Sequence, residues 1–577
     1  MLIGERGAYR LAKALEPLQI PATAQAILAA RIDRLPPEDK RLLQVASVIG
    51  KDVTFTLLQA IADEPEADLH RHLAHLQAAE FLYETALFPD PEYTFKHALT
   101  HEVAYGNVLQ ERRRGLHARI VEVIERLYRE RLPEHVERLA HHASRGEVWE
   151  KAVTYLRQAG AKAFARSTNR EAVSYFEQAL AALRHLPETR ATLEQDVDLR
   201  FHLRTSLLAL GEVRRVLALL REAESIARAL DDQRRLARVC IFAANCHFLL
   251  GDPDRALEFG KRALATGVAL EDRRLQIEAS VFLGQTLYQI GDVRRGIQLL
   301  TQSLASLEEQ GVSERVGMAG LPIVCRSWLL WCLADIWEFA EGMPVAEEAM
   351  RFAGAGDRPG GRIVAGFGAA YFYLRKGDFE KAIAVNEPGI TLCRGGNFPL
   401  LFPIVAMQLG YAYALSGRVD EAIPLLEEAV GQAAAQGVMA VHSLHHSYLG
   451  EAYRLAGRMG EANRAAERAL ELARAHKEPR NEAQALWLLG KIRSRGEAIE
   501  RDRAEAFYRQ ALGIAERLDL RPWVADCRLD LGLLYRRRDA VGEARKDIGT
   551  ALALYREMGM DSWERRAHVA LAKLETA

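Results

Sequence analysis

The chain has 577 residues, with 77 Lys and Arg against 78 Asp and Glu, and a formal net charge of −1 at pH 7. This length exceeds what one compact core covers, so we expect several units or an array of repeats. The balanced charge excludes a global electrostatic reason to bind nucleic acid or an anionic membrane.

The six cysteines are scattered and form no C-x-x-C pair. Their spacing supports neither a zinc knuckle nor a thioredoxin-type motif, and we expect small buried side chains in a reducing compartment. The first residues, MLIGERGAYRLAKALEPL, contain no apolar region of signal-peptide length, and no run of about 18 apolar residues occurs. These observations predict a cytoplasmic protein without a membrane-spanning segment.

Residues 21–132 lack the periodicity of the rest of the chain and are expected to form a small domain of their own. Apolar spacing and helix-start signals predict three helices, over residues 27–35, 38–49 and 69–80. The segments FLYE and FPDPEYTF then predict two short strands joined by a turn. Helices followed by a small hairpin and a long helix are typical of a winged helix.

The stretch YTFKHALTHEVAYGNVLQERRRGLHARI places His97 and His101 four residues apart, so they can share a helical face. A zinc site needs a third and usually a fourth ligand, but Glu102 lies off this face and His117 belongs to a later helix. The order H-x-x-x-H-E matches no zinc-protease motif. We interpret these histidines as surface or hydrogen-bonded core residues and expect no metal. The apolar stripe of the helix is predicted to consist of Phe95, Leu99, Val103 and Leu109.

The remaining basic and histidine-rich stretches carry no ligand pattern. The arginines at 112–114 would suit DNA phosphates in a winged helix, but nearby glutamates favour a solvated face. The histidines outside the 93–120 stretch are interpreted as helix-face residues: His70, His72, His75, His141, His142, His445 and His446. The Gly-Lys pairs at 50–51 and 260–261 lack the first glycine of a P-loop, and we find no catalytic motif.

From about residue 199 the sequence repeats itself. The pieces LGYAYALSGRVDEAIPLLEEAV and LGEAYRLAGRMGEANRAAERAL share Leu-Gly, an aromatic residue three positions later, and a small residue twelve after the Gly. That last position recurs every 36 to 50 residues, mostly every 40, at Val216, Ala256, Gly296, Ala346, Ala382, Ala422, Ala462, Ala504 and Ala544. Small residues at this spacing predict helical hairpins whose two helices cross closely and stack into a superhelix.

The pattern L-G-x-x-Y…A…A resembles the tetratricopeptide repeat, with a period of about 40 instead of roughly 34 residues. The expected organisation is a linker remnant over 1–20, the winged-helix-like domain over 21–132, irregular hairpins over 133–198, and the repeat superhelix over 199–577. An insert over 311–322 is expected to be a loop.

In tetratricopeptide superhelices the first helix of each hairpin lines a concave groove. Transferred to this chain, that arrangement predicts an aromatic groove formed by Phe248, Tyr288, Trp328, Trp331, Phe367, Tyr371 and Tyr411. Such a groove suits a peptide, an amphipathic helix or a small apolar effector. The alternative is that these aromatic residues pack the hairpins together.

Three stretches, PATAQAILAARIDRLPPEDKRLLQVASVIG, YTFKHALTHEVAYGNVLQERRRGLHARI and LAHHASRGEVWEKAVTYLRQAG, together resemble the C-terminal portion of bacterial multidomain signalling ATPases. In that family a class III adenylate/guanylate cyclase domain is often followed by a STAND-type ATPase, a winged helix and tetratricopeptide repeats. No cyclase domain, P-loop or Walker B strand matches here. The resemblance implies a fragment or short form that begins where the ATPase core would end.

The resemblance also implies a role for His97. The segment F-K-H-A-L-x-x-x-V-A is similar to the winged-helix region whose histidine reaches the β-phosphate of ADP in STAND ATPases. His97 would be that residue, and ATP or ADP would bind only with an ATPase core supplied in cis or in trans.

The function expected from these observations is a non-catalytic regulatory and protein-interaction module. Its partners would be a protein or peptide, or an ATPase core, and neither nucleic acid nor a membrane is expected. The alternatives are a fragment of a STAND-type transcriptional regulator, a free-standing tetratricopeptide scaffold, or an enzyme. The last residues, ERRAHVALAKLETA, keep the repeat pattern and argue against a C-terminal helix-turn-helix, and an enzyme would need a catalytic set that is not visible.

Overall fold

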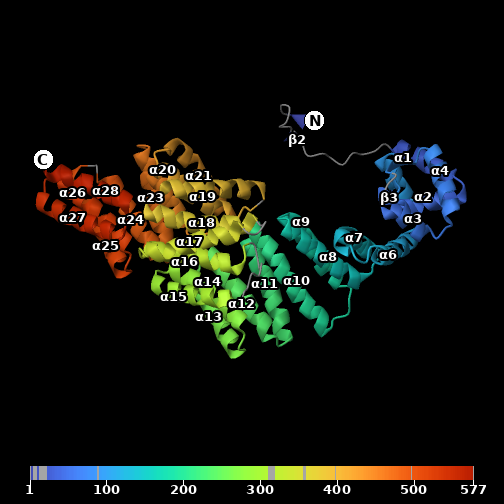
Figure 1. Ribbon diagram of the computed structural model, residues 1–577, viewed down its shortest axis with the longest axis horizontal. Coiled ribbons are helices and arrows are strands. Elements are labelled where there is room, and N and C mark those ends of the chain that lie inside the picture. Colours follow the sequence, from blue (N-terminus) through green and yellow to red (C-terminus); the bar gives the residue numbers. More distant parts are fainter. Residues whose placement is uncertain are drawn as a thin grey trace. The chain divides into compact units, whose positions relative to one another are not determined.

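The computed structural model describes residues 2–3, 10–11, 22–86, 90–309, 319–354, 359–396, 398–494 and 497–575. The chain forms two compact units (Figure 1). Met1–Ala159 with Gln178–Pro187 is the N-terminal unit, and Gly160–Glu177 with Glu188–Ala577 is the repeat unit. The described residues contain 28 α-helices, so the prediction of a mainly α-helical protein is confirmed. None of these helices combines the length and apolarity that a bilayer span requires.

The N-terminal unit combines short strands with helices of moderate length. Its elements are β1 (Leu2–Ile3), β2 (Arg10–Leu11), α1 (Ala22–Asp33), α2 (Pro37–Ile49), β3 (Asp52–Thr54), α3 (Phe55–Ala62), α4 (Glu66–Ala78), β4 (Leu82–Ala86), β5 (Glu92–Phe95), α5 (Ala98–Gly106), α6 (Gln110–Leu127), a 3-10 turn (Leu132–Glu134) and α7 (Val136–Arg145). The helices α8 (Trp149–Ala165) and α9 (Asn169–Leu183) contribute to both units. Most of the predicted 1–20 linker lies outside the described residues.

This unit contains a three-stranded antiparallel sheet of order β3-β5-β4. Val53 of β3 pairs with Tyr93 of β5, and Leu82 of β4 pairs with Phe95 of β5. All four side chains are buried, because alternate residues of a strand face the same side. The two predicted strands are therefore confirmed as β4 and β5. Strand β3 and helix α3 were not predicted.

The predicted apolar stripe around His97 is partly wrong. Phe95 is buried but belongs to β5, and the helix begins only at Ala98. Helix α5 ends at Gly106, so Leu109 does not continue its face and is 78% exposed just before α6. The buried residues of α5 are instead Thr100 and Ala104.

The repeat unit consists of antiparallel helical hairpins that follow one another along the chain (Figure 1). Their first helices are α10 (Arg190–Ala209), α12 (Gln233–Leu249), α14 (Arg273–Gln289), α16 (Leu321–Asp335), α18 (Pro359–Lys376), α20 (Phe402–Leu415), α22 (His442–Leu455), α24 (Pro479–Arg493) and α26 (Arg521–Arg536). Their second helices are α11 (Val213–Ala229), α13 (Pro253–Ala269), α15 (Val293–Glu309), α17 (Phe339–Gly354), α19 (Phe379–Gly395), α21 (Val419–Gln436), α23 (Met459–Ala475), α25 (Ala498–Arg517) and α27 (Val541–Glu557). Helix α28 (Asp561–Glu575) follows.

Two sequence signals explain why the hairpins form. The nine small positions predicted at the helix crossings are all buried in second helices. At the facing position of the first helix, a Cβ added to Gly410 would lie 2.7 Å from Leu426 Cγ, so only glycine permits this approach. The turn inside a hairpin uses a glycine with positive φ, as at Gly251 (72°), and Asp252 then caps the next helix by accepting a hydrogen bond from the Arg255 N–H.

The predicted loop over 311–322 lies mainly outside the described residues. Helix α16 already begins at Leu321, with Pro322 in its first turn, so the last two residues of the predicted loop are helical. Proline is well suited to this position because its missing N–H has no partner in the first turn of a helix.

The superhelix is coiled tightly enough for its successive turns to touch. The side chain of Gln289 donates to Glu478 at 3.2 Å, and these residues are 189 positions apart. His476 Nδ1 lies 2.8 Å from the Gly251 carbonyl, 225 positions away, and the Ser562 hydroxyl donates to the Gly377 carbonyl at 3.1 Å. Because the turns touch, much of the inner face is packed with side chains and is not an open groove.

Candidate functional site

A pocket remains open in the first half of the repeat unit. It has a volume of about 200 Å³ and is lined mainly by the first helices of successive hairpins, α10 to α20, together with the turn that precedes α22. The lining residues lie between Arg204 and His445 in sequence, so the pocket exists only because the superhelix brings distant hairpins together. Pockets of this kind, concave and mostly apolar with a few polar groups, are typical ligand sites.

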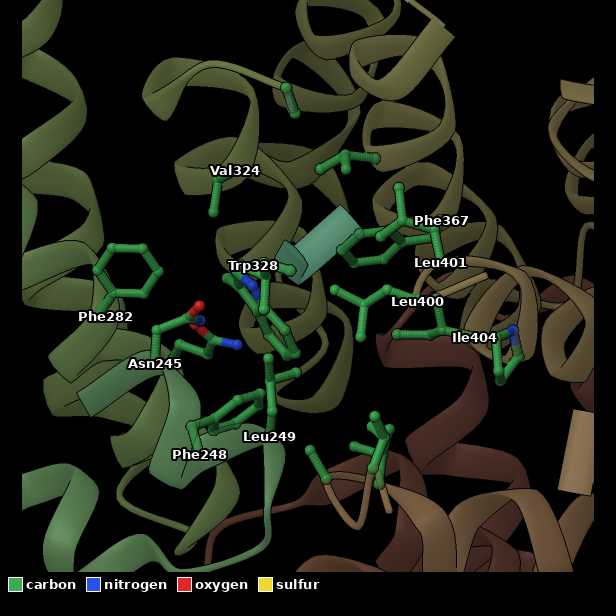
Figure 2. Close-up of a pocket in the computed structure, with 18 of the residues that line it drawn as sticks. Asn245, Phe248, Leu249, Phe282, Val324, Trp328, Phe367, Leu400, Leu401 and Ile404 are labelled. Carbon is green, nitrogen blue, oxygen red and sulfur yellow. The ribbon is translucent and has the colours of Figure 1, made fainter. Parts of the chain in front are cut away.

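Aromatic and aliphatic side chains form most of the pocket wall (Figure 2). The Trp328 ring is central: it lies 5.4 Å from the Phe248 ring and 6.0 Å from the Phe367 ring, both in edge-on arrangements. Leu400, Leu401 and Ile404 approach from the start of α20. These contacts hold the rings in fixed positions and provide an apolar surface for a ligand.

One part of the wall is polar. Arg204, Asn245, Glu278 and Gln285 line it from α10, α12 and α14, and all four are buried. The Arg204 guanidinium lies over the Phe242 ring, 3.9 Å from its centre, and donates a long hydrogen bond of 3.5 Å to Asn245 Oδ1. Arg204 Nε and Gln285 Oε1 are buried without a hydrogen-bond partner. Buried polar atoms are rarely left without partners, so these two atoms require an explanation.

The seven aromatic residues of the predicted groove are distributed over three environments. Phe248, Trp328 and Phe367 line the pocket. Tyr411 stacks on Tyr448 with 3.7 Å between ring centres. The other three, Tyr288, Trp331 and Tyr371, are buried in the core.

Those three core residues surround a buried carboxylate. The Tyr288 and Tyr371 hydroxyls donate to Asp335 at 2.8 and 2.7 Å, and the Arg480 Nε lies 3.3 Å from the same carboxylate. The Trp331 ring stacks on Tyr371 at 4.0 Å. Burial raises the pKa of both tyrosines well above the usual value, so they stay protonated and donate. This cluster joins helices α14, α16, α18 and α24, and Arg375 Nε lies 3.7 Å from the same carboxylate.

His97 lies immediately before α5, and its side chain is exposed. His101 is different, because its Nε2 lies 2.9 Å from the Ser47 carbonyl and its ring packs against Phe95. The two histidines therefore do not share a ligand site. The nearby arginines are surface residues: Arg114 pairs with Glu147 at 3.1 Å, and Arg113 lies over the Tyr105 ring.

Two histidine clusters were missed by sequence reasoning. His117 on α6 meets His142 on α7, with 2.8 Å between their Nδ1 atoms, and His141 lies close by. The Tyr105 hydroxyl lies 3.1 Å from His117 Nε2, and His142 bonds the Ile49 carbonyl. A neutral chain of hydrogen bonds from Tyr105 to Ile49 satisfies every one of these atoms.

Electrostatics at this cluster favour neutral histidines. Burial lowers the pKa of His117 to about 4 and that of His142 to about 2, and neighbouring arginines lower both further. In the second cluster, Asp39 of α2 is buried and bonds His72 of α4 at 2.5 Å, while His75 lies 3.3 Å away. Both clusters join helices that are distant in sequence, so no local pattern could have predicted them.

All six cysteines are free and buried, as predicted. Burial raises the pKa of Cys325 and Cys393 to about 12, so neither thiol forms a thiolate at neutral pH.

Comparisons with known proteins give a limited set of similarities. No family model matches the chain. An uncharacterized protein of Rhizobium meliloti is 29% identical over 177 residues, which are 30% of this chain; the chain spans 17% of the length of that curated relative. A Rap protein crystallised with competence and sporulation factor gives a TM-score of 0.46 at 17% identity, over 63% of this chain and 98% of that one.

A second solved structure is a STAND protein with a tetratricopeptide repeat sensor from Pyrococcus horikoshii. It gives a TM-score of 0.34 at 13% identity, over 94% of this chain and 67% of that one. At such values a likeness carries no information on ligand or activity. The chain is thus similar to proteins built from tetratricopeptide repeats, and its own helix packing defines the superhelix described above.

Proposed function

We propose that this chain is a non-catalytic regulatory module of a bacterial signalling ATPase of the STAND type, of the kind associated with adenylate/guanylate cyclase domains. The repeat unit binds an effector or a protein partner, and the N-terminal unit passes that signal to a nucleotide-bound ATPase core. The observation that carries the proposal is the apolar pocket around Trp328, which is built from seven hairpins and contains buried polar atoms without partners.

The position of the pocket supports a sensing role. Its walls come from α10 at one end and from the turn before α22 at the other, so a ligand would contact hairpins that are far apart in sequence. A ligand that contacts several hairpins binds one curvature of the superhelix better than another. Differential affinity of this kind is what shifts a conformational equilibrium.

The N-terminal unit supports the second half of the proposal. We take the order α2, β3, α3, α4, β4, β5 with sheet order β3-β5-β4 as support for a winged helix. His97 follows the last strand and is exposed, so its imidazole is free to donate to a phosphate held by another domain. The sequence resemblance assigns this histidine the role of contacting ADP, which we adopt as part of the proposal.

The test for the N-terminal half begins with the coding sequence upstream of Met1 and the adjacent genes. A P-loop ATPase is expected there. Co-purified with that ATPase, the chain is expected to increase retention of ADP, and His97→Ala to abolish the increase while leaving the complex intact. The absence of an ATPase gene, or unchanged ADP retention in the variant, would contradict this half and leave a free-standing repeat scaffold.

The test for the repeat unit uses the neutral apolar dye Nile red on the full chain. We expect saturable fluorescence enhancement at a single site, lost in Ile404→Trp, whose larger side chain fills the pocket. Phe352→Trp is the matched control, because Phe352 is 50% exposed on α17 and does not line the pocket. Equal dye binding by all three proteins would contradict a ligand site at Trp328.

A further inference from the structure

The Arg204 side chain breaks the repeat pattern at a buried position. It follows Leu203 in α10, and the residues at the same place in later hairpins are mostly small: Ala244, Gly284, Ala334, Ala370, Gly410, Gly450 and Gly532. The Arg204 side chain is 6% exposed. A buried charged residue where the repeat mostly places glycine or alanine has a cost in stability, and such violations of local rules are expected at functional sites.

The charge of Arg204 is not balanced by its surroundings. Among the described residues, no carboxylate lies within ion-pair distance of its guanidinium, and its one hydrogen bond is the long contact with Asn245. Glu278, the acidic residue of the pocket wall, attracts Arg204 from beyond ion-pair distance and is engaged by Arg274 at 3.2 Å. Arg238 also lies over the Phe242 ring, 5.6 Å from its centre, and adds positive charge. His445 is kept neutral, since burial lowers its pKa to about 4.

A buried guanidinium without a counter-ion is unfavourable, because desolvation is not offset by Coulomb attraction. Burial lowers the pKa of Arg204 to about 10, so the group is still charged at neutral pH. The Gln285 amide oxygen nearby also has no partner. An anionic group on Arg204, with a bridging water that donates to Gln285, would satisfy both atoms.

Building on the proposed function, we propose that the pocket binds a single-chain amphiphile with an anionic head, with the head on Arg204 and Gln285 and the apolar chain along Phe248, Trp328 and Phe367. The size of the pocket limits the length of the ligand's alkyl chain. Its volume of about 200 Å³ is moderately larger than the roughly 150 Å³ of an engineered cavity that holds benzene. A medium-length alkyl carboxylate therefore fits better than a long lipid chain.

Arg204 and Gln285 would contact the head group in different ways. Arg204 supplies two or more N–H groups in a plane that suits a carboxylate. Gln285 offers its amide oxygen to a water that donates both to it and to the carboxylate head. The stacked Phe242 ring holds the guanidinium in place.

The experiment is isothermal titration calorimetry of the full chain with three probes of equal length: decanoate, decanol and decylammonium. We expect decanoate to bind at least tenfold more tightly than decanol, and decylammonium to bind most weakly. Arg204→Met keeps the length of the side chain without its charge, and is expected to lose the preference for decanoate while retaining decanol binding. The same variant should melt at a temperature equal to or above that of the wild type.

Arg238→Met is the matched control, because it removes an equal charge beside the same Phe242 ring but outside the pocket wall. It should keep the decanoate preference. Gln285→Leu provides a second pocket variant and, because it removes only the acceptor of the bridging water, should weaken decanoate while leaving it bound more tightly than decanol. Equal affinity for all three probes would overturn the anionic head and leave the proposed function standing. Binding of none of them, with Nile red still bound at the pocket, would overturn the amphiphile in favour of a larger ligand such as an apolar peptide.

Discussion

The two halves of α16 present the same kind of surface to two different environments. Its C-terminal half carries Trp331 and Asp335 into a core where the carboxylate has two tyrosine hydroxyls and an arginine as partners. Its N-terminal half carries Val324 and Trp328 into a pocket where Arg204 and Gln285 have unpaired atoms. Aromatic residues on the inner face of a superhelix therefore do not identify a binding site. The open space beside Trp328 is what separates the pocket half from the packed half around Asp335.

The largest loss of stability is expected from Asp335→Ala, which removes the buried carboxylate at the C-terminal end of α16. It leaves Arg480, which is buried, without its counter-ion and removes the acceptor of Tyr288 and Tyr371. Removing one partner of a buried ion pair costs about 3–5 kcal/mol. Urea unfolding of the full chain measures this loss. Asp254→Ala, which breaks the exposed pair with Lys477, is the control and should cost under about 1 kcal/mol. Similar losses in both variants would contradict a structural role for the Asp335 cluster.

Truncating apolar residues along α16 compares its packed residues with those that line the pocket. Leu330 is fully buried, so Leu330→Ala creates a cavity and is expected to cost about 2–5 kcal/mol. Val324 faces the pocket, where space already exists, so Val324→Ala should cost under about 1 kcal/mol. Urea unfolding again provides the measurement. A loss at Val324 equal to that at Leu330 would mean that the pocket is closed in solution.

A pH titration extends the comparison to paired polar groups of the N-terminal unit. The pKa of His117 is lowered to about 4 in the fold, so the unfolded chain takes up the proton first as pH falls below about 6.5. Stability is therefore complete above pH 6.5 and decreases towards pH 4, by about 2 kcal/mol per such histidine at pH 5. Hydrogen exchange of α6 and α7 measures the loss. The double variant His117→Gln, His142→Gln should flatten this dependence, and an unchanged pH profile would contradict the neutral hydrogen-bond chain.

The smallest effect is expected at His97. Its side chain is exposed, and exposed substitutions away from special features change stability by less than about 0.5 kcal/mol. Thermal unfolding of His97→Ala should match the wild type. A clear loss of stability would make His97 a structural residue and remove the support for its proposed contact with a phosphate.

The hairpins could be predicted from sequence because their signals are local. A glycine or alanine at a fixed spacing is needed wherever two helices cross closely. The spacing of Ala422 and Ala462 can be seen directly in the sequence. The turn glycines, such as Gly251, are equally local, since only the backbone conformation requires them. The three predicted helices before residue 81 were found for the same reason, with shifts of a few residues at the ends.

The candidate site could be predicted only in part. Trp328 was assigned to the inner face, but whether that face is open depends on contacts such as that between Gln289 and Glu478, 189 residues apart. A repeat pattern of about 40 residues cannot predict a contact over such a sequence separation. Arg204 did have a signal, because it stands where the repeat mostly has glycine or alanine, but its meaning depends on the absence of an ion-paired carboxylate among the described residues.

The most direct test of the account is hydrogen exchange of the full chain with and without saturating decanoate. Binding at the pocket predicts slower exchange in α10, in the N-terminal half of α16 and at the start of α20, with little change around Asp335. This pattern should be absent in Arg204→Met. Unchanged exchange throughout, or slowing confined to elements that do not line the pocket, would contradict the claim that the pocket around Trp328 is a binding site.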